Sequence, residues 1–293
     1  MDAFSASLMA DKREIIFAPT VYKFQTFAQM AEEFKLNERD VVLTNEFIYT
    51  PFMKDLGLKC HYVFQEKFGA GEPSEEMIQV MYDAIPYDSY DRVIAVGGGA
   101  IMDLCKLLGC KRPDTVHNLY FKRFPVVHEK DVIAIPTTCG TGSEVTSFSV
   151  ITDKKNGNIK YPLADYSLTP DVAIIDPQFT WSMPKSIVAD TGLDVLTHAI
   201  EAYVSVMASD YTDGLALHAI EMVFTYLEKS YNGDPLAREK MHNASCIAGM
   251  AFTNAFLGLN HSMAHKLGAE CHIPHGRANA ILLPYVIKYN ATK

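Results

Sequence analysis

The chain has 293 residues, of which 48% are hydrophobic and 21% are charged, and its formal net charge at pH 7 is −9. This length allows a large core and predicts two domains rather than one. An acidic chain without a cluster of lysines and arginines is a poor candidate for binding nucleic acid or an anionic membrane surface, and no apolar run is long enough to span a bilayer. The N-terminus lacks the pattern of a secretory signal and the six cysteines lack framework spacing, so we expect a cytoplasmic protein with reduced thiols.

The first half of the sequence alternates short apolar runs with helix-length amphipathic segments. The apolar runs predict buried strands at REIIFAP, DVVLTN, CHYVFQE, DRVIAVGGG, DVIAIPTT and DVAIIDP. Helices are predicted at QTFAQMAEEF and SEEMIQVMYDAI, and Ser74 is placed to cap the second of them. This alternation is typical of a parallel sheet covered on both faces. We therefore predict an α/β domain over residues 1–182.

The first candidate binding element is a strand that runs into three glycines, in VIAVGGGAIMDLCK from Val93 to Lys106. Glycines let the backbone turn tightly and approach a ligand, and a helix that starts near Ala100 would offer free N–H groups to a phosphate. The spacing is not that of the G-x-G-x-x-G fingerprint. A tight strand–helix turn without a ligand explains the glycines equally well.

Hydroxyl side chains and glycines are interleaved in a second loop, IPTTCGTGSEVTSFSVITD, from Ile135 to Asp153. Such a loop can present hydroxyls and amides to a phosphate or a ribose, although a polar surface loop has the same composition. Both loops follow buried strands of the same predicted sheet. In a parallel sheet both would emerge at the carboxyl edge, where ligands bind, so the two loops support one another.

Long helical patterns replace the strand signals from about Trp181 onward, and Met183-Pro184 is the expected hinge before them. The patterns are SIVADTGLDVLTHAIEAYVSV, DGLALHAIEMVFTYLEKSY and AREKMHNASCIAGMAFTNAFLG. We predict an all-helical domain over residues 183–293. Because the sequence stops after a helical pattern without a terminating glycine or proline, we expect this domain to be incomplete at its C-terminus.

Polar side chains at helical spacing mark a candidate metal site in the second half. Asp194 and His198 are four residues apart, as are His261 and His265, and His275 follows in a turn shaped by a proline and a glycine. One carboxylate and one imidazole on a helix face make half of a divalent metal site, but a hydrogen bond within the helix is the simpler interpretation of that pair alone. A second helix that supplies one imidazole, and a loop that supplies another, could complete the site.

Taken together, these segments resemble the iron-containing (group III) alcohol dehydrogenase family. The resemblance covers nearly the whole chain, and it rests on VIAVGGGAIMDLCK, AIPTTCGTGSEVT, the D-x-x-x-H of Asp194 and His198, and G-x-x-H-x-x-A-H-x-x-G followed by P-H-G between Gly258 and Gly276. It implies a Rossmann-like, dinucleotide-binding α/β domain with a parallel sheet and an all-α metal-binding domain, in the architecture shared with dehydroquinate synthases. It also implies an active site in the cleft between them, a homo-oligomer that is a dimer or larger, and a chain that continues past the equivalent of Lys293.

Carried over by position, the resemblance implies a metal centre and a catalytic residue. The metal would be Fe²⁺, with Zn²⁺ fitting the donors about equally well. His265 would lie close to the metal without being a ligand and would relay protons to solvent. The implied metal ligands are Asp194, His198, His261 and His275.

The resemblance also implies a nicotinamide cofactor. NAD(H) is expected, and NADP(H) stays open because neutral Asn45 stands where many NAD-using members carry an aspartate at the adenosine ribose. The glycine turn would hold the pyrophosphate, and Lys160 would lie near the nicotinamide ribose. Where many members read N-P, this chain has Glu72-Pro73, and Ala100 replaces the usual serine after the glycines. The implied cofactor-binding residues are Asn45, Gly97, Gly98, Gly99, Asp103, Thr137, Thr138, Thr141 and Lys160.

The resemblance divides between two subgroups, which bears on the substrate. From Phe17 to Met77 the chain is similar to 4-hydroxybutyrate dehydrogenases, which reduce succinic semialdehyde; from Tyr161 onward it is similar to the alcohol dehydrogenase half of bifunctional aldehyde–alcohol dehydrogenases. The second half is widely shared in the family, so we expect hydride transfer between NAD(P) and 4-hydroxybutyrate or succinic semialdehyde. The alternatives are another short-chain alcohol such as ethanol, butanol or propanediol, a glycerol dehydrogenase or dehydroquinate synthase type of reaction, and a truncated inactive chain that binds cofactor or pairs with a full-length partner.

Overall fold

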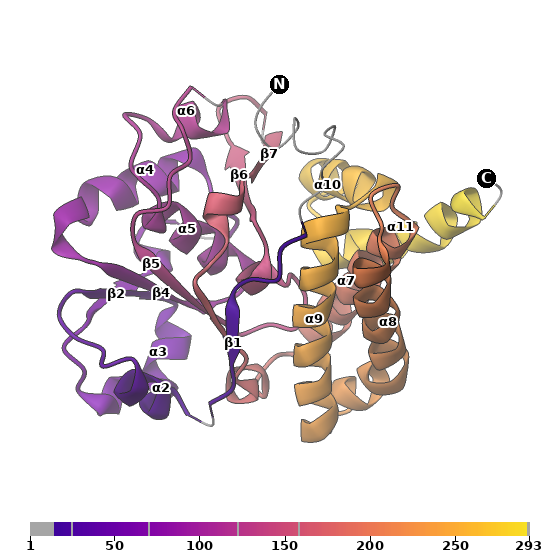
Figure 1. The fold of residues 1–293 in the computed structure, drawn as a ribbon, viewed down its shortest axis with the longest axis horizontal. Helices are drawn as coiled ribbons and strands as arrows, with labels where there is room; N and C mark the ends of the chain where they lie inside the picture. Colours follow the sequence, from indigo (N-terminus) through magenta and orange to yellow (C-terminus); the bar gives the residue numbers. More distant parts are fainter. Residues whose placement is uncertain (1–14, 25, 70, 122, 158, 292–293) are drawn as a thin grey trace. The chain divides into compact units, whose positions relative to one another are not determined.

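The computed structural model describes residues 15–24, 26–69, 71–121, 123–157 and 159–291 (Figure 1). By its internal packing the chain divides into two units. The first unit comprises residues up to Pro136 together with Ser147–Ile174, and the second comprises Thr137–Thr146 and Ile175–Lys293. The sequence predicts a division at residue 183 with the loop Ile135–Asp153 in the first domain, whereas Thr137–Thr146 packs with the helical unit.

A six-stranded sheet forms the centre of the first unit, with the strand order β1-β8-β5-β4-β2-β3. All of its strand pairs are parallel. The predicted parallel α/β sheet is therefore confirmed. The strands are β1 (Thr20–Tyr22), β2 (Asp40–Thr44), β3 (His61–Phe64), β4 (Arg92–Gly97), β5 (Asp131–Pro136) and β8 (Val172–Ile174).

Helices cover both faces of this sheet. They are α2 (Phe27–Glu33), α3 (Glu46–Phe52), α4 (Glu75–Ala84), α5 (Gly99–Gly109) and α6 (Val116–Tyr120). Figure 1 shows α4 and α5 on one side of the sheet and α2 and α3 on the other. Ser74 caps α4 as predicted, because its side chain accepts a hydrogen bond from the Met77 backbone N–H at 3.3 Å. Central strands β4 and β5 are buried along nearly their whole length, as expected for strands with helices on both faces.

The first strand begins later than the sequence suggested. Residues 15–18, in the predicted strand REIIFAP, form no strand, and β1 starts at Thr20; the first two residues of that predicted strand lie outside the described residues. The strand lies at the sheet edge and its side chains are exposed. Its position is set by pairing with β8, with Thr20 opposite Val172, which an apolar run alone does not specify.

A separate hairpin replaces part of the predicted loop. β6 (Phe148–Asp153) and β7 (Ile159–Ala164) pair antiparallel, whereas the sequence predicts one loop from Ile135 to Asp153. Ile151 and Leu163 from the two strands are buried in the core of the first unit. The hairpin therefore belongs to the first unit, unlike the threonine-rich segment that precedes it.

The second unit is helical, as predicted. Its helices are α7 (Lys185–Val204), α8 (Asp210–Tyr231), α9 (Pro235–Ala255), α10 (Leu259–Cys271) and α11 (His275–Asn290). Helices α7, α8 and α9 pack on one another, α11 packs on α7, and α10 packs on α11. Among the described residues, no helix has the length and apolar character needed to cross a membrane.

The segment Thr137–Thr146 is held tightly against α9. Gly142 has φ +58°, a left-handed conformation that favours glycine, and a Cβ atom placed on it would come within 2.8 Å of Gly249 Cα and 2.9 Å of the Ser245 carbonyl oxygen. Both glycines are therefore required for this close approach of loop and helix. The packing explains why the segment belongs to the helical unit although it follows a strand of the sheet.

Candidate functional site

Helix α7 carries two of the predicted metal ligands into the interior of the second unit. Asp194 is 3% exposed and His198 is 4% exposed. A carboxylate and an imidazole are costly to bury unless they are hydrogen-bonded, paired or bound to a metal. The buried polar face of this helix therefore requires partners from neighbouring elements.

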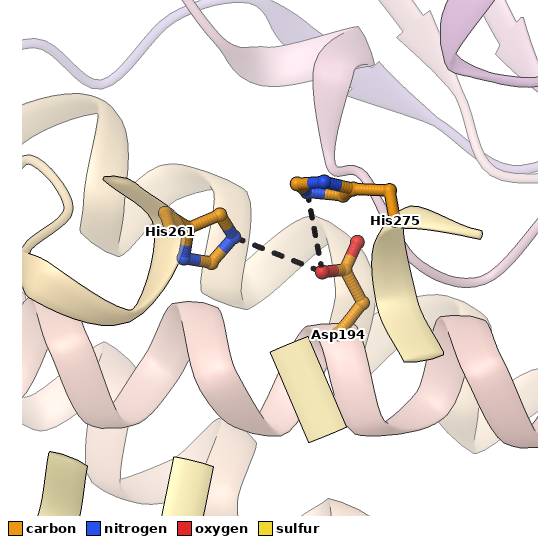
Figure 2. A group of neighbouring side chains, drawn as sticks. All are labelled: Asp194, His261 and His275. Carbon is orange, nitrogen blue, oxygen red and sulfur yellow. Dashed lines mark ion pairs between the residues drawn. The ribbon is translucent and has the colours of Figure 1, made fainter. Parts of the chain in front are cut away.

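Helices α10 and α11 supply those partners. His261 Nε2 lies 3.7 Å and His275 Nε2 lies 3.6 Å from the same oxygen, Asp194 Oδ1 (Figure 2). One potential ligand atom from each of the three side chains lies within 4.8 Å of the others. Three of the four predicted ligands, separated by up to 81 residues in the chain, are thus brought together around one point.

A glycine lets His275 reach this position. His275 is the first residue of α11, and Gly276 follows it directly. A Cβ atom at Gly276 would collide with the carbonyl oxygen of Asp190 on α7. Because no side chain separates the two backbones, the start of α11 lies against α7 one turn from Asp194.

The fourth predicted ligand, His198, lies against the same cluster. Its ring is stacked between Phe252 and His261, with centroid distances of 4.4 Å and 4.5 Å. Its Nδ1 is buried without a hydrogen-bond partner among the described residues. Burial lowers the pKa of His198 to about 3, outweighing the opposite effect of Asp194, so the ring is neutral and has a lone pair available for a metal.

Asp194 and His261, the other two buried side chains of the cluster, are held in oppositely charged forms. Burial would raise the pKa of Asp194, but the surrounding imidazoles outweigh it and hold that pKa well below its usual range. Burial would lower the pKa of His261, but the carboxylates of Asp194 and Glu201 outweigh it and raise the pKa to about 9. The metal-free site therefore favours a proton on His261, and a cation that binds there must displace it.

Asn279 was not predicted, yet its amide lies at the centre of the cluster. Its Nδ2 is 2.7 Å from Asp194 Oδ1, 3.1 Å from His261 Nε2 and 3.2 Å from His275 Nε2. Its Oδ1 accepts a hydrogen bond from Asn260 Nδ2 at 2.9 Å, which orients the amide. Asn279 lies four residues after His275 on α11, and this helical spacing is the signal that could have revealed it.

Glu201 was also missed. It is 3% exposed, and its Oε2 lies 2.5 Å from His261 Nδ1, on the opposite side of the ring from Asp194. It lies three residues after His198 and seven after Asp194, which places all three on one face of α7. An acidic residue at that spacing could have been singled out from the sequence.

The two remaining histidines of the C-terminal segment differ in position. The His265 ring lies 6.3 Å from the His261 ring and stacks on His275 at 5.1 Å, so it borders the cluster without entering it. His272 is exposed and ends α10 in a left-handed conformation, with φ +53°.

The donor set fits a divalent transition metal. The cluster offers three imidazoles and one carboxylate, which suit Fe²⁺ or Zn²⁺. The NH₂ group of Asn279, which is the positive end of its amide dipole, lies within hydrogen-bonding distance of these ligand atoms at the point where they converge. The residues thus provide a negative environment for a cation and a neutral, orphaned imidazole beside it.

The predicted glycine turn has the local form that the sequence suggested. β4 ends at Gly97, Gly98 is the N-cap of α5 and Gly99 begins that helix. No side-chain hydrogen bond caps the start of α5 at Gly98, so its first backbone N–H groups have no intrahelical partner. This is the geometry that suits a phosphate group.

The predicted threonines lie in the second unit. Thr137 directly follows β5 and is buried, while Thr138 and Thr141 are partly exposed. The Thr141 hydroxyl accepts a hydrogen bond from the Ser143 N–H at 3.3 Å. Thr141 therefore shapes the loop as well as offering a hydroxyl.

Asp103 and Lys160, two further predicted cofactor residues, also have protein partners. Asp103 Oδ2 accepts a hydrogen bond from the Val150 N–H at 2.9 Å, which ties α5 to β6. Lys160 Nζ forms an ion pair with Glu72 Oε1 at 2.6 Å. Each side chain thus has a structural role in the first unit, and a cofactor role stays a proposal.

Two family sequence profiles match the chain. The profile of iron-containing alcohol dehydrogenases matches residues 19–177, and the profile of the Fe-containing alcohol dehydrogenase family, C-terminal, matches residues 188–293. The chain belongs to the iron-containing alcohol dehydrogenase family.

Curated members of the family and a solved structure are similar to the chain. Aldehyde-alcohol dehydrogenase 2 of Entamoeba histolytica is 55% identical over 236 residues, which cover 76% of this chain and 27% of that protein. The 4-hydroxybutyrate dehydrogenase of Clostridium kluyveri is 38% identical over 275 residues, covering 92% of this chain and 74% of that protein. Sulfoacetaldehyde reductase from Bifidobacterium kashiwanohense, solved with NAD⁺, has a TM-score of 0.84 at 30% identity, covering 95% of this chain and 77% of that one. The chain therefore spans less than a third of the aldehyde–alcohol dehydrogenase and about three quarters of the other two.

A second group of possible ligands lies in the first unit of this family member. Glu75 Oε1 is 3.0 Å from His117 Nδ1, and an oxygen of Asp153 lies nearby. The Asp153 carboxylate already accepts hydrogen bonds from the Lys155 and Asn156 backbone N–H groups and from Asn156 Nδ2. Its lone pairs are thus used to close a turn, and the second unit holds the better metal site.

Proposed function

We propose that the chain is a metal-dependent alcohol dehydrogenase and aldehyde reductase that uses a nicotinamide cofactor. The observation that carries the proposal is the convergence of Asp194, His261 and His275 in the second unit, with neutral His198 stacked beside them. Membership of the iron-containing family supports Fe²⁺ as the metal, and the donors suit Zn²⁺ as well.

In this proposal the protein supplies charge and orientation. When bound, the divalent ion polarises the aldehyde oxygen as a Lewis acid, and the reduced nicotinamide supplies the hydride. Asp194 contributes the only formal negative charge of the proposed ligand set, and its lowered pKa keeps it ionised. The neutral imidazoles hold the net charge of the occupied site positive, which favours the alkoxide over the alcohol.

We propose His265 as the group that passes the proton between the substrate oxygen and solvent. It is partly exposed and stacks on His275 at the edge of the cluster. His265→Ala should keep the metal but lower kcat by about 10²-fold or more, the usual contribution of a general acid. Added imidazole should restore part of that loss. Unchanged turnover in the variant would rule out the role.

We propose NAD(H) as the preferred cofactor, whereas the sequence alone leaves NADP(H) open. Asn45 follows β2, and the next residue, Glu46, donates its backbone N–H to the Glu66 carboxylate at 3.2 Å. Two carboxylates at this strand end would repel the 2′-phosphate that distinguishes NADP(H). Glu66→Gln should narrow the preference for NADH over NADPH by about fivefold, the effect of roughly 1 kcal/mol.

The substrate we propose is 4-hydroxybutyrate, with succinic semialdehyde as the aldehyde. The likeness of the N-terminal half to 4-hydroxybutyrate dehydrogenases and the coverage of 92% of the chain by the Clostridium kluyveri enzyme support it. The second candidate is an uncharged short aldehyde, because a carboxylated substrate calls for a cationic side chain that is not already paired. Arg277, two residues after His275, already binds both oxygens of Asp190 at 3.1 Å, so its charge is neutralised within the protein.

We propose that the protein forms a homo-oligomer. β1 is an edge strand of the described sheet, and its Val21 and Tyr22 are exposed. Such edges pair readily with another chain. Light scattering after size exclusion should give a mass of at least twice 32.6 kDa, and a mass of one chain would contradict this.

One panel of assays tests these choices together. The protein is loaded with Fe²⁺ or Zn²⁺ without oxygen, and oxidation of NADH and NADPH is followed with succinic semialdehyde and with butanal, its uncharged analogue of equal chain length. A higher kcat/KM for succinic semialdehyde supports the 4-hydroxybutyrate proposal. Equal or better turnover of butanal supports the uncharged aldehyde, and no turnover of any aldehyde contradicts the proposed function.

A further inference from the structure

Glu201 occupies an unusual position between α7 and α10. Its Oε1 accepts a hydrogen bond from the Asn260 N–H at 2.6 Å. Its Oε2 accepts one from the His261 N–H at 3.2 Å and lies 2.5 Å from His261 Nδ1. The carboxylate thus contacts the first turn of α10 and one ring nitrogen of a proposed metal ligand at the same time.

These contacts decide which ring nitrogen carries a proton. The carboxylate can only accept hydrogen bonds, and two of its partners are backbone N–H donors. His261 Nδ1 must therefore be the protonated nitrogen of the neutral ring. Nε2, which lies 3.7 Å from Asp194 Oδ1, is then left with its lone pair directed at the cluster.

The site also explains why a carboxylate is stable there. Glu201 lies at the N-terminus of α10, where the unpaired N–H groups and the helix dipole favour a negative charge. A Cβ atom on Gly258, the N-cap residue of that helix, would come within 3.0 Å of Glu201 Oε1. The absence of a side chain at Gly258 leaves room for the carboxylate to approach the helix start.

We infer that Glu201 is a positioning residue of the metal centre: it holds His261 with Nδ1 protonated and Nε2 directed at the shared point between Asp194 and His275. The inference rests on the proposed function, in which His261 is a ligand. Carboxylates that orient metal-binding imidazoles in this way raise the affinity for the metal without touching it.

Glu201→Gln is the sharpest variant because it keeps the shape and removes one acceptor. If the glutamine oxygen faces Asn260, its NH₂ group faces His261 Nδ1 and drives the ring proton onto Nε2, the ligand atom. If the amide is turned around, its NH₂ group meets the Asn260 N–H donor instead. Neither orientation satisfies all of the donors that the carboxylate satisfies.

The experiment measures metal affinity by competition with a chromophoric chelator, using Zn²⁺ and metal-stripped protein. Glu201→Gln should weaken binding by about 10- to 100-fold relative to the wild type. The matched control is Asp40→Asn, another buried carboxylate with a charged partner, which lies in the first unit and pairs with Arg92. The control should bind Zn²⁺ with wild-type affinity, even if it lowers the melting temperature.

Each outcome bears on the inference. Wild-type Zn²⁺ affinity in Glu201→Gln overturns the positioning role but leaves the proposed function intact. An equal loss of Zn²⁺ affinity in Asp40→Asn has the same consequence, because general destabilisation would then explain the loss in both variants. A wild-type protein that binds no metal contradicts both the inference and the proposed function. If Glu201→Gln fails to fold, the crystal structure of the Zn²⁺-loaded wild type decides. His261 Nδ1 should stay within hydrogen-bonding distance of Glu201, and a carboxylate that turns away or ligates the zinc itself overturns the inference.

Discussion

His261 is in contact with charged or polar groups at both of its ring nitrogens. Nδ1 faces Glu201, and Nε2 faces Asp194 and the Asn279 amide. The ring is 3% exposed, so every one of these interactions acts in a protein environment rather than in water. A side chain held so firmly loses little conformational entropy when a metal binds, which is the physical advantage of building the ligand into a buried network.

Removing this imidazole should abolish metal retention. His261→Ala deletes a proposed ligand and leaves Glu201 and Asp194 as two buried carboxylates without their shared partner, so we expect less than one tenth of the wild-type metal content after gel filtration. Metal analysis by mass spectrometry measures it. His272→Ala removes an exposed imidazole from the end of the same helix and should keep full metal content. Full metal content in His261→Ala would remove this residue from the site.

His128 and Asp171 give the first unit a pH-dependent contribution to stability. The hydrogen bond to Asp171 raises the pKa of His128 more than burial lowers it. Burial would raise the pKa of Asp171, but the hydrogen bonds from His128 and from the Val132 N–H, together with the charge of His128, outweigh burial and lower that pKa. The protonated His128 contributes its full stabilisation below the pKa of histidine in the unfolded chain, and this stabilisation is lost as the pH rises through the raised pKa of the folded state. The ionised Asp171 contributes its full stabilisation above the pKa of aspartate in the unfolded chain, and this stabilisation is lost as the pH falls through the lowered pKa of the folded state.

The pair should therefore stabilise the fold most at mildly acidic pH. Both groups are partly exposed, so we expect about 1 kcal/mol or less. Urea unfolding at pH 5.5 and pH 9 should show that the wild type loses this amount relative to His128→Gln as the pH rises. Identical pH dependence in the two proteins would mean that the pair contributes nothing measurable.

At the scale of elements, the close approach of the loop Thr137–Thr146 to α9 depends on glycine. Gly142→Ala adds a Cβ atom to a residue in the left-handed conformation, and that Cβ would lie 2.8 Å from the Gly249 Cα. The substitution should cost about 1 kcal/mol for the backbone and a further 1–3 kcal/mol for the overlap. Gly57→Ala is the matched control, because Gly57 has φ +61° with no atom near its Cβ position. Denaturant unfolding of both variants should separate the two costs. Equal losses would show that the loop does not pack as described.

Some elements could be read from the sequence and others could not. The helices α7, α8 and α9 and the strands β4 and β5 have long or strongly apolar patterns, which predicted them. The edge strand β1 was misplaced because its residues are exposed and its position comes from pairing with β8. The β6–β7 hairpin was missed because Ser147, Ser149 and Thr152 continue the hydroxyl-rich composition of the preceding loop, so β6 was grouped with that loop.

The candidate site shows the same division. The proposed metal ligands follow from a family resemblance, whereas helical spacing alone left Asp194 and His198 open to a simpler interpretation. Asn279 and Glu201 were missed because a single polar residue on a helix is usually a surface residue, and their helical spacing to His275 and His198 was not singled out. Their contacts with the cluster form where α10 packs on α11 and α11 packs on α7.

For the whole molecule, all of the proposed metal ligands lie within one unit, while the proposed cofactor residues are divided between both. Metal binding should therefore stabilise the helical unit by mass action. At a free metal concentration 1,000 times the Kd, the stabilisation is about 4 kcal/mol. Differential scanning calorimetry with saturating Zn²⁺ and with EDTA should show a higher unfolding temperature for the metal-loaded protein. Superimposable scans would show that the metal-free fold gains nothing from the ion.

A titration of turnover with metal is the most direct test of the proposal that the protein is a metal-dependent dehydrogenase. Metal-stripped protein is titrated with Fe²⁺ without oxygen, and NADH oxidation by a short aldehyde is followed at each addition. We expect turnover to rise from background and to saturate at one metal ion per chain. Full turnover in stripped protein, or none at saturating metal with bound Fe²⁺ confirmed by analysis, would contradict it.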